Sequence, residues 1–96
     1  MYVVASLWSI TPGQEEEFVA RGGKIADLLR QTGGITSFLG FRTDDGHGMA
    51  VVGYESKEAY DRIVTDPNGP FAKAAAEYKI EEVGEWIQSW RGEQTH

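Results

Sequence analysis

The first ten residues alternate between apolar and small or polar positions, as an extended strand does. Ser6, Trp8 and Ile10 fall on one face of residues 2–10, and Leu7 falls on the other. The segment is rich in β-branched and aromatic residues, and a Thr-Pro-Gly sequence follows it directly. This pattern predicts a β-strand that ends at residue 10.

The spacing of apolar residues then changes to a helical period. Phe18, Ile25 and Leu29 form one stripe of a predicted helix over residues 14–31, whose first turn holds three glutamates. The helix contains a Gly22-Gly23 pair, which predicts close backbone packing or a kink at that point. Two further glycines after residue 32 are typical of a helix C-terminus.

The rest of the chain predicts three more strands and a helical unit that is broken in two. An Asp-Gly turn at 44–48 joins two strands as a hairpin, Ser56 is a good N-cap, and Pro70 suits the start of a helix. The order βαββαβ predicts a ferredoxin-like α+β fold, with one antiparallel sheet and helices on one face. The expected elements are strands 35–43 and 49–55, helices 56–65 and 71–79, strand 80–91 with Glu81 and Glu85 on one face, and a frayed tail 92–96.

Composition describes one acidic domain, residues 1–96, with 41% hydrophobic and 25% charged residues. The net charge of −6 opposes binding to nucleic acid or to an anionic membrane surface. The chain has no cysteine, which excludes disulfides, thiolate catalysis and cysteine-ligated metals. We expect no signal peptide, no membrane-spanning segment and a cytoplasmic location.

Large side chains fall on both faces of the predicted strands, although the helices cover only one face. A chain of 96 residues also buries a modest share of its surface when it folds alone. A second copy is the simplest cover for the other face, so the sequence predicts a homodimer.

Four segments of the chain form a recognisable combination. They are the first strand running into Thr11-Pro12-Gly13-Gln14-Glu15-Glu16-Glu17-Phe18, the set Gly33-Gly34 followed by Phe38, Phe41 and Arg42, the strand-to-helix junction 51–60, and Pro70-Phe71. Together these segments resemble those of the dimeric α+β-barrel superfamily and, within it, the antibiotic-biosynthesis-monooxygenase-like domains. The resemblance covers nearly the whole chain and implies a homodimer whose two sheets meet as a barrel, with a cleft between sheet and helices in each subunit. Some members of this family oxidise quinols or polycyclic phenols with molecular oxygen and no bound cofactor, and others cleave haem.

Ser6, Trp8 and Tyr54 are the residues that we expect in the cleft. Ser6 and Trp8 share a strand face, and Tyr54 matches the family's cleft position. The rings of Trp8 and Tyr54 can stack on a flat substrate and donate a hydrogen bond to a phenolic oxygen. The alternative is that these rings fill the core. The same two interpretations hold for the aromatic residues that would complete the pocket, namely Tyr60, Phe71, Tyr78 and Trp86.

The haem-cleaving members use an Asn, a Trp and a His whose matching positions here are Ser6, Tyr54 and Ile63. All three differ, so haem degradation by that arrangement is not expected. The leading hypothesis is a monooxygenase without cofactor or metal that acts on an aromatic or quinol-like molecule. The alternative is a non-enzymatic, dimeric ligand-binding or accessory domain of the same fold. His47 is interpreted as a turn residue and Arg42 as a surface charge rather than an anion-binding group.

Overall fold

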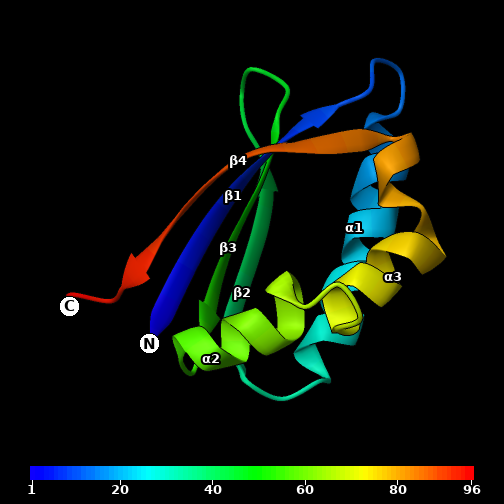
Figure 1. Cartoon of the computed structure of the whole chain (residues 1–96). Coiled ribbons are helices and arrows are strands. Elements are labelled where there is room, and N and C mark those ends of the chain that lie inside the picture. The colour runs from blue at the N-terminus through cyan, green and yellow to red at the C-terminus, as the bar shows by residue number, and fades with distance from the viewer.

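The computed structural model describes all 96 residues as one four-stranded antiparallel sheet with helices on one face (Figure 1). The strand order is β2-β3-β1-β4, so the first strand lies in the interior and pairs with both β3 and β4. This is the ferredoxin-like fold predicted from the sequence. The elements are β1 (Tyr2–Ile10), α1 (Glu15–Arg30), β2 (Ile35–Arg42), β3 (Gly48–Tyr54), α2 (Lys57–Tyr60), the π-helical turn η1 (Asp61–Thr65), α3 (Pro70–Tyr78), the 3₁₀ turn η2 (Ile80–Glu82) and β4 (Gly84–Glu93).

The hydrophobic core lies between the sheet and the helices, and its members come from every layer. Val4 and Val52 point inward from neighbouring strands, and Ile25 and Leu29 meet them from α1. Ile63 of η1 is the most deeply buried large side chain, at 1% exposure. Ile25 and Leu29, which belong to the helical stripe predicted from the sequence, are therefore core residues.

Local signals fixed the start of each short helix as predicted. The Ser56 hydroxyl accepts a hydrogen bond from the Ala59 amide at 3.1 Å and caps α2. Pro70 occupies the first turn of α3, where its missing N–H costs no helical hydrogen bond. None of the helices combines the length and the apolar character needed to cross a membrane.

The last strand differs from the prediction at both ends. Residues 80–82 form a 3₁₀ turn instead of the start of a strand, because Lys79 adopts a left-handed conformation (φ 53°) that turns the chain. Ile80 and Val83 are thereby buried in the core. Glu81 consequently lies outside the strand that carries Glu85, and the shared face expected for them is wrong.

The C-terminal tail is also more ordered than predicted. Strand β4 continues to Glu93, and the Gln94 amide donates a hydrogen bond of 2.8 Å to the carbonyl of Met1. The two chain ends therefore lie together at one end of the sheet (Figure 1).

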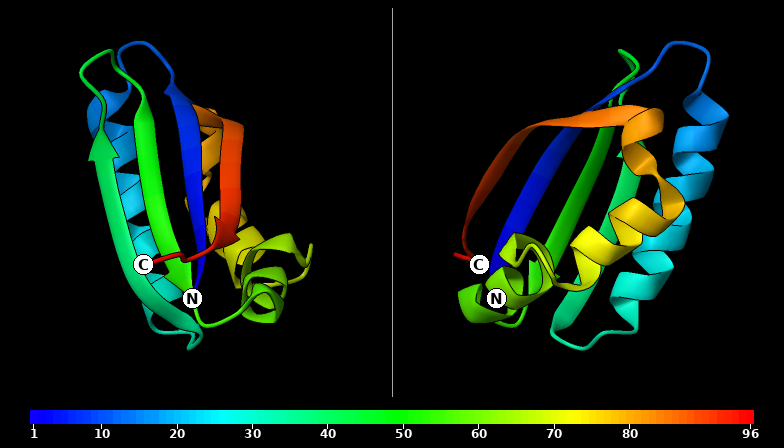
Figure 2. Two further views of the ribbon diagram at one scale, coloured as in Figure 1. Left: turned by 90° about the vertical axis from the view of Figure 1, so that its left-hand side faces the viewer. Right: turned by 45° about the vertical axis from the view of Figure 1, so that its right-hand side comes forward.

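No helix covers the face of the sheet opposite α1 and α3 (Figure 2). Four residues that are paired in register form a row across this face: Leu39, Val51, Ala5 and Trp90. Leu39 is 60% exposed and Trp90 is 53% exposed. We call this row the open-face row, and it is the surface that the sequence predicted a second copy would cover.

Candidate functional site: a cavity between the sheet and helix α1

A cavity of about 560 Å³ lies between α1 and the sheet. Its floor is a row of small residues, Gly40, Ala50 and Ser6, which the register aligns across β2, β3 and β1. Gly22 and Ala26 face this row from α1 and are equally small. The space exists because two opposed surfaces both lack large side chains at the same level of the sheet.

The glycine pair in α1 therefore does something other than what the sequence predicted. A Cβ placed on Gly22 or on Gly23 would meet no atom within 4 Å, so neither glycine permits a close backbone approach. Both residues line the cavity. The prediction of close packing is wrong, and the pair contributes open volume.

Gly22→Ala is expected to stabilise the protein by about 1 kcal/mol, because alanine costs less backbone entropy in a helix and finds free space here. Urea unfolding at a fixed protein concentration measures the change. Ala20→Gly, on the exposed side of the same helix, is the matched control and should lose a similar amount. An unchanged or lower unfolding midpoint for Gly22→Ala would show that the position is already filled.

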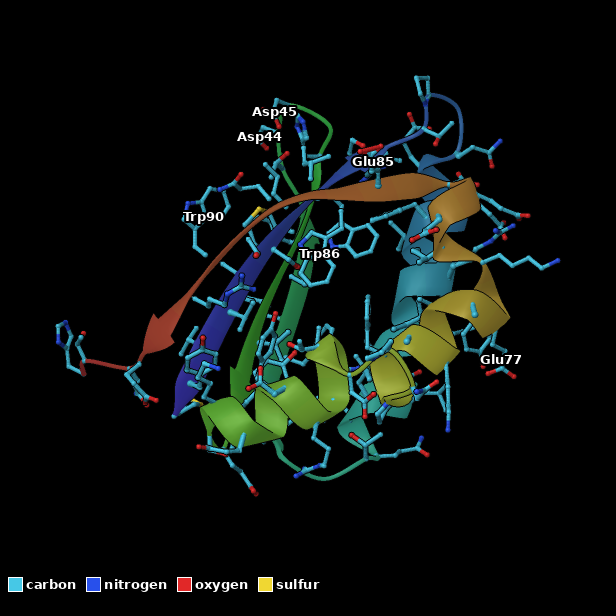
Figure 3. All side chains as sticks on the ribbon, viewed as in Figure 1. Asp44, Asp45, Glu77, Glu85, Trp86 and Trp90 are labelled. Atoms are coloured by element: carbon cyan, nitrogen blue, oxygen red, sulfur yellow. The ribbon has the colours of Figure 1, made fainter.

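Aromatic rings close the cavity at the end where β4 begins. Trp8 stacks on Trp86 with ring centroids 5.7 Å apart and an angle of 13° between the ring planes. Phe71 of α3 meets Trp86 edge-on at 5.7 Å, and Phe18 of α1 lies 5.9 Å from Trp8. The side chain of Trp86 points between the sheet and the helices, whereas that of Trp90 points away from them (Figure 3).

Because Gly48 has no side chain, the ring of Phe18 can lie directly against the sheet. A Cβ on Gly48 would come within 2.6 Å of this ring. The ring therefore lies directly against the backbone of β3 and forms one wall of the cavity, which it lines together with Trp8.

The opposite end of the cavity is formed by tyrosines. Tyr54 and Tyr60 pack edge to face, with ring centroids 5.2 Å apart. The Tyr60 hydroxyl is already engaged, because it accepts a hydrogen bond of 2.9 Å from Nη1 of Arg91. Tyr60 therefore offers its ring to the cavity, while its hydroxyl oxygen is held by Arg91 and its hydroxyl hydrogen has no acceptor within the protein.

The indole N–H groups of the two tryptophans that line the cavity, Trp8 and Trp86, also donate hydrogen bonds within the protein. Nε1 of Trp8 donates to Oγ of Ser6 at 3.3 Å, and Nε1 of Trp86 donates to the carbonyl of Gln88 at 3.1 Å. The hydrogen bond from Trp8 to a ligand that the sequence suggested is therefore replaced by an internal one. The role left to Trp8 is that of an apolar wall which orients Ser6.

Besides Tyr60, two further residues that line the cavity carry hydroxyl groups that donate no hydrogen bond within the protein. Ser6 is 8% exposed, and its oxygen accepts the Trp8 hydrogen bond without donating one of its own. Tyr54 is 3% exposed, and its hydroxyl makes no hydrogen bond within the protein. Every side-chain nitrogen or oxygen atom that is fully buried has a hydrogen-bond partner. Because the Tyr54 oxygen has no partner, it is not fully buried and can be reached by a small molecule. Burial raises the pKa of Tyr54 well above its ordinary value, with a smaller contribution from Tyr60, and keeps the hydroxyl protonated.

The structure brings together six of the seven residues predicted for the pocket. These residues all line the cavity: Ser6, Trp8, Tyr54, Tyr60, Phe71 and Trp86. Tyr78, the seventh, does not line the cavity. It follows Phe71 by two helical turns, about 10 Å along α3, which carries it past the cavity. Its ring lies 5.7 Å from the Lys24 ammonium instead.

Three charged residues that the sequence analysis did not assign to the pocket line the cavity: Asp27, Arg30 and Arg42. Arg42 is exposed, in agreement with its interpretation as a surface charge, and it also borders the cavity. The signal was present, because Phe38, Gly40 and Arg42 share one strand face by alternation. His47 lies outside the cavity, in the hairpin turn, where its Nδ1 is 3.0 Å from Oδ1 of Asp45.

Neither a metal centre nor the haem-cleaving arrangement has support among the residues present. The chain contains no cluster of three or more His, Cys, Asp or Glu side chains that could hold a metal ion. Ile63, at the position of the haem-ligating histidine, is buried in the core and does not line the cavity.

Comparison with known proteins agrees with the fold. No family model and no curated protein matches the sequence. Among solved structures, an antibiotic biosynthesis monooxygenase superimposes with a TM-score of 0.79 at 13% identity, and the match covers 100% of both chains. SnoaB, a cofactor-independent oxygenase from Streptomyces nogalater, gives a TM-score of 0.76 at 14% identity over 98% of this chain and 94% of its own. The structural-genomics protein YJCS gives a TM-score of 0.76 at 13% identity over 98% of each chain. The resemblance seen in the sequence is therefore confirmed at the level of the fold.

Proposed function

We propose that this protein is a cofactor-independent monooxygenase that acts on an aromatic or quinol-like small molecule. The observation that carries the proposal is the cavity, which is walled by aromatic rings and contains two buried hydroxyl donors, on Ser6 and Tyr54, without acceptors in the protein. Buried donors of this kind select a ligand that supplies acceptor oxygens. The shared fold with SnoaB, a cofactor-independent oxygenase, is consistent with this assignment.

The proposed chemistry needs little from the protein beyond binding and orientation. A polycyclic phenol with an activated CH₂ group can deliver its own electrons to dioxygen. One oxygen atom then becomes the new carbonyl oxygen, and the other leaves as water with the two hydrogens of the CH₂ group. Tyr54, held neutral by its raised pKa, donates a hydrogen bond to the phenolate oxygen and stabilises the electron-rich form of the substrate. The apolar walls keep bulk water from the reacting carbon.

Tyr54→Phe is expected to lower substrate-dependent oxygen uptake about a hundredfold, because it removes one preorganised donor and leaves the ring in place. An oxygen electrode with a panel of quinols and anthrone-type phenols measures the effect. Tyr60→Phe is the matched control, since its hydroxyl faces Arg91 and should matter less to turnover. Equal uptake by wild type and Tyr54→Phe with every accepted substrate would contradict the proposal.

In this proposal the protein works as a cytoplasmic homodimer. The exposed apolar residues of the open-face row are the supporting observation, because an apolar patch of this kind on a sheet marks an interaction surface. Pairing two such sheets face to face leaves each cavity on the outer side of its own sheet, next to its own helices. The dimer would therefore bury the bare faces without blocking the cavities.

The alternative function is a non-enzymatic dimeric domain that binds an aromatic ligand. The charged groups that line the cavity are one aspartate and two arginines, and no histidine is present there to move a proton near neutral pH. A protein that binds the substrate panel and consumes no oxygen with any member would favour this alternative.

A further inference from the structure

The net charge of the residues that line the cavity is opposite in sign to the net charge of the whole chain. The chain carries a net charge of −6, whereas the charged residues that line the cavity are Arg30, Arg42 and Asp27, a sum of +1. Nη1 of Arg30 is paired with Oδ1 of Asp27 at 3.0 Å. Arg42 forms no ion pair and no side-chain hydrogen bond in the protein, so its positive charge is the uncompensated one.

Arg42 is exposed at the edge of the sheet and borders the cavity. Strand β2 is an edge strand of the sheet, and Arg42 is its last residue. Ser6 lies across β3 from Gly40, two strand spacings or about 10 Å from the edge. Arg42 follows Gly40 by two residues on the same face, about 7 Å farther along β2. A flat molecule of two or three fused rings that meets Ser6 at its inner end would extend to the edge strand, within reach of a flexible arginine.

We propose that Arg42 is a specificity-determining residue and that the ligand of this cavity is an aromatic acid, whose ionised carboxylate pairs with Arg42 at the edge of β2. The inference rests on the proposed function for the location of the ligand, and it adds the charge and polarity of that ligand. The guanidinium offers paired donors that match the two oxygens of a carboxylate. An acceptor oxygen of the ring system faces Ser6 at the inner end, so both ends of the ligand are recognised.

Calorimetric titration with two matched probes tests this assignment. The probes are an anthraquinone carboxylate and the corresponding primary carboxamide, which differ in charge and hardly in shape. Wild-type protein is expected to bind the carboxylate about fivefold more tightly, and high salt should reduce the preference. Arg42→Met should remove the preference by weakening the carboxylate alone, and Arg42→Lys should restore part of it.

Arg62→Met is the matched control, because Arg62 is exposed, lies outside the cavity and carries the same charge. Equal binding of the two probes to wild type, or a preference that survives Arg42→Met, would overturn the assignment. A loss of equal size in Arg62→Met would do the same, since it would trace the effect to net charge. If neither probe bound, the proposed site and this inference would both fail. A carboxylate preference without oxygen uptake from any reduced substrate would reject the oxygenase alone and leave the aromatic-acid site standing.

Discussion

Replacing Leu39 and Trp90 together by aspartate is expected to convert the proposed dimer, of about twice 10.6 kDa, into a monomer of 10.6 kDa. Leu39 and Trp90 end the open-face row on β2 and β4, and both are more than half exposed in the single chain. Burying such side chains between two copies contributes roughly 25 cal/mol per Å² of apolar surface removed from water. Two aspartates would remove that contribution and place four unpaired carboxylates in the interface of a symmetric dimer.

Light scattering at micromolar concentration measures the mass directly. Ala76→Asp, on the exposed side of α3, is the control for added negative charge and should leave the dimer intact. Neither Leu39 nor Trp90 lines the cavity, so the monomer should keep its ligand site if it stays folded. Wild-type protein that runs as a monomer at this concentration would contradict the dimer.

Filling the cavity from both walls is expected to abolish ligand binding while the protein becomes more stable. In the double variant Gly22→Leu with Gly40→Leu, one new side chain projects from α1 and the other from β2. A Cβ on Gly22 meets nothing within 4 Å, and a Cβ on Gly40 meets only the Met49 carbonyl, at 3.8 Å. Both substitutions also replace glycine inside a regular element, which contributes about 0.5–1 kcal/mol each. Affinity for an aromatic ligand should fall by more than about a hundredfold, because the ring site itself is occupied.

The opposite signs of the two effects make this test specific. Destabilising variants lose binding and stability together, whereas this one should lose binding and gain stability in the same preparation. Ala20→Leu, on the exposed side of α1, is the control and should leave binding unchanged. Undiminished affinity in the double variant would place the ligand somewhere other than this cavity.

The residues that sequence reasoning placed correctly are those whose role follows from period and local chemistry. Ser6 and Trp8 lie on the helix-facing side of β1, as alternation predicted, and Ser56 caps a helix as its hydroxyl suggested. Tyr78 lies outside the cavity although Phe71 lines it, because helical spacing identifies a face of a helix but not how far along the helix that face borders the cavity. The start of β4 was misjudged because Lys79 takes a left-handed conformation, which glycine usually marks and lysine does not.

By itself the sequence determined the order of elements, the inward and outward faces of each strand and the aromatic supply of the site. Each of these follows from intervals of two to four residues along the chain. Only the tertiary structure decided that Gly22 and Gly40, far apart in sequence, face each other as open volume. It also decided that the indole N–H of Trp8 donates to Ser6, whereas the Tyr54 hydroxyl donates to no group in the protein. The position of Arg42 beside the cavity was likewise set by the tertiary structure. These outcomes depend on cross-strand register and on helix placement, which are set by packing among distant residues and leave no periodic trace in the sequence.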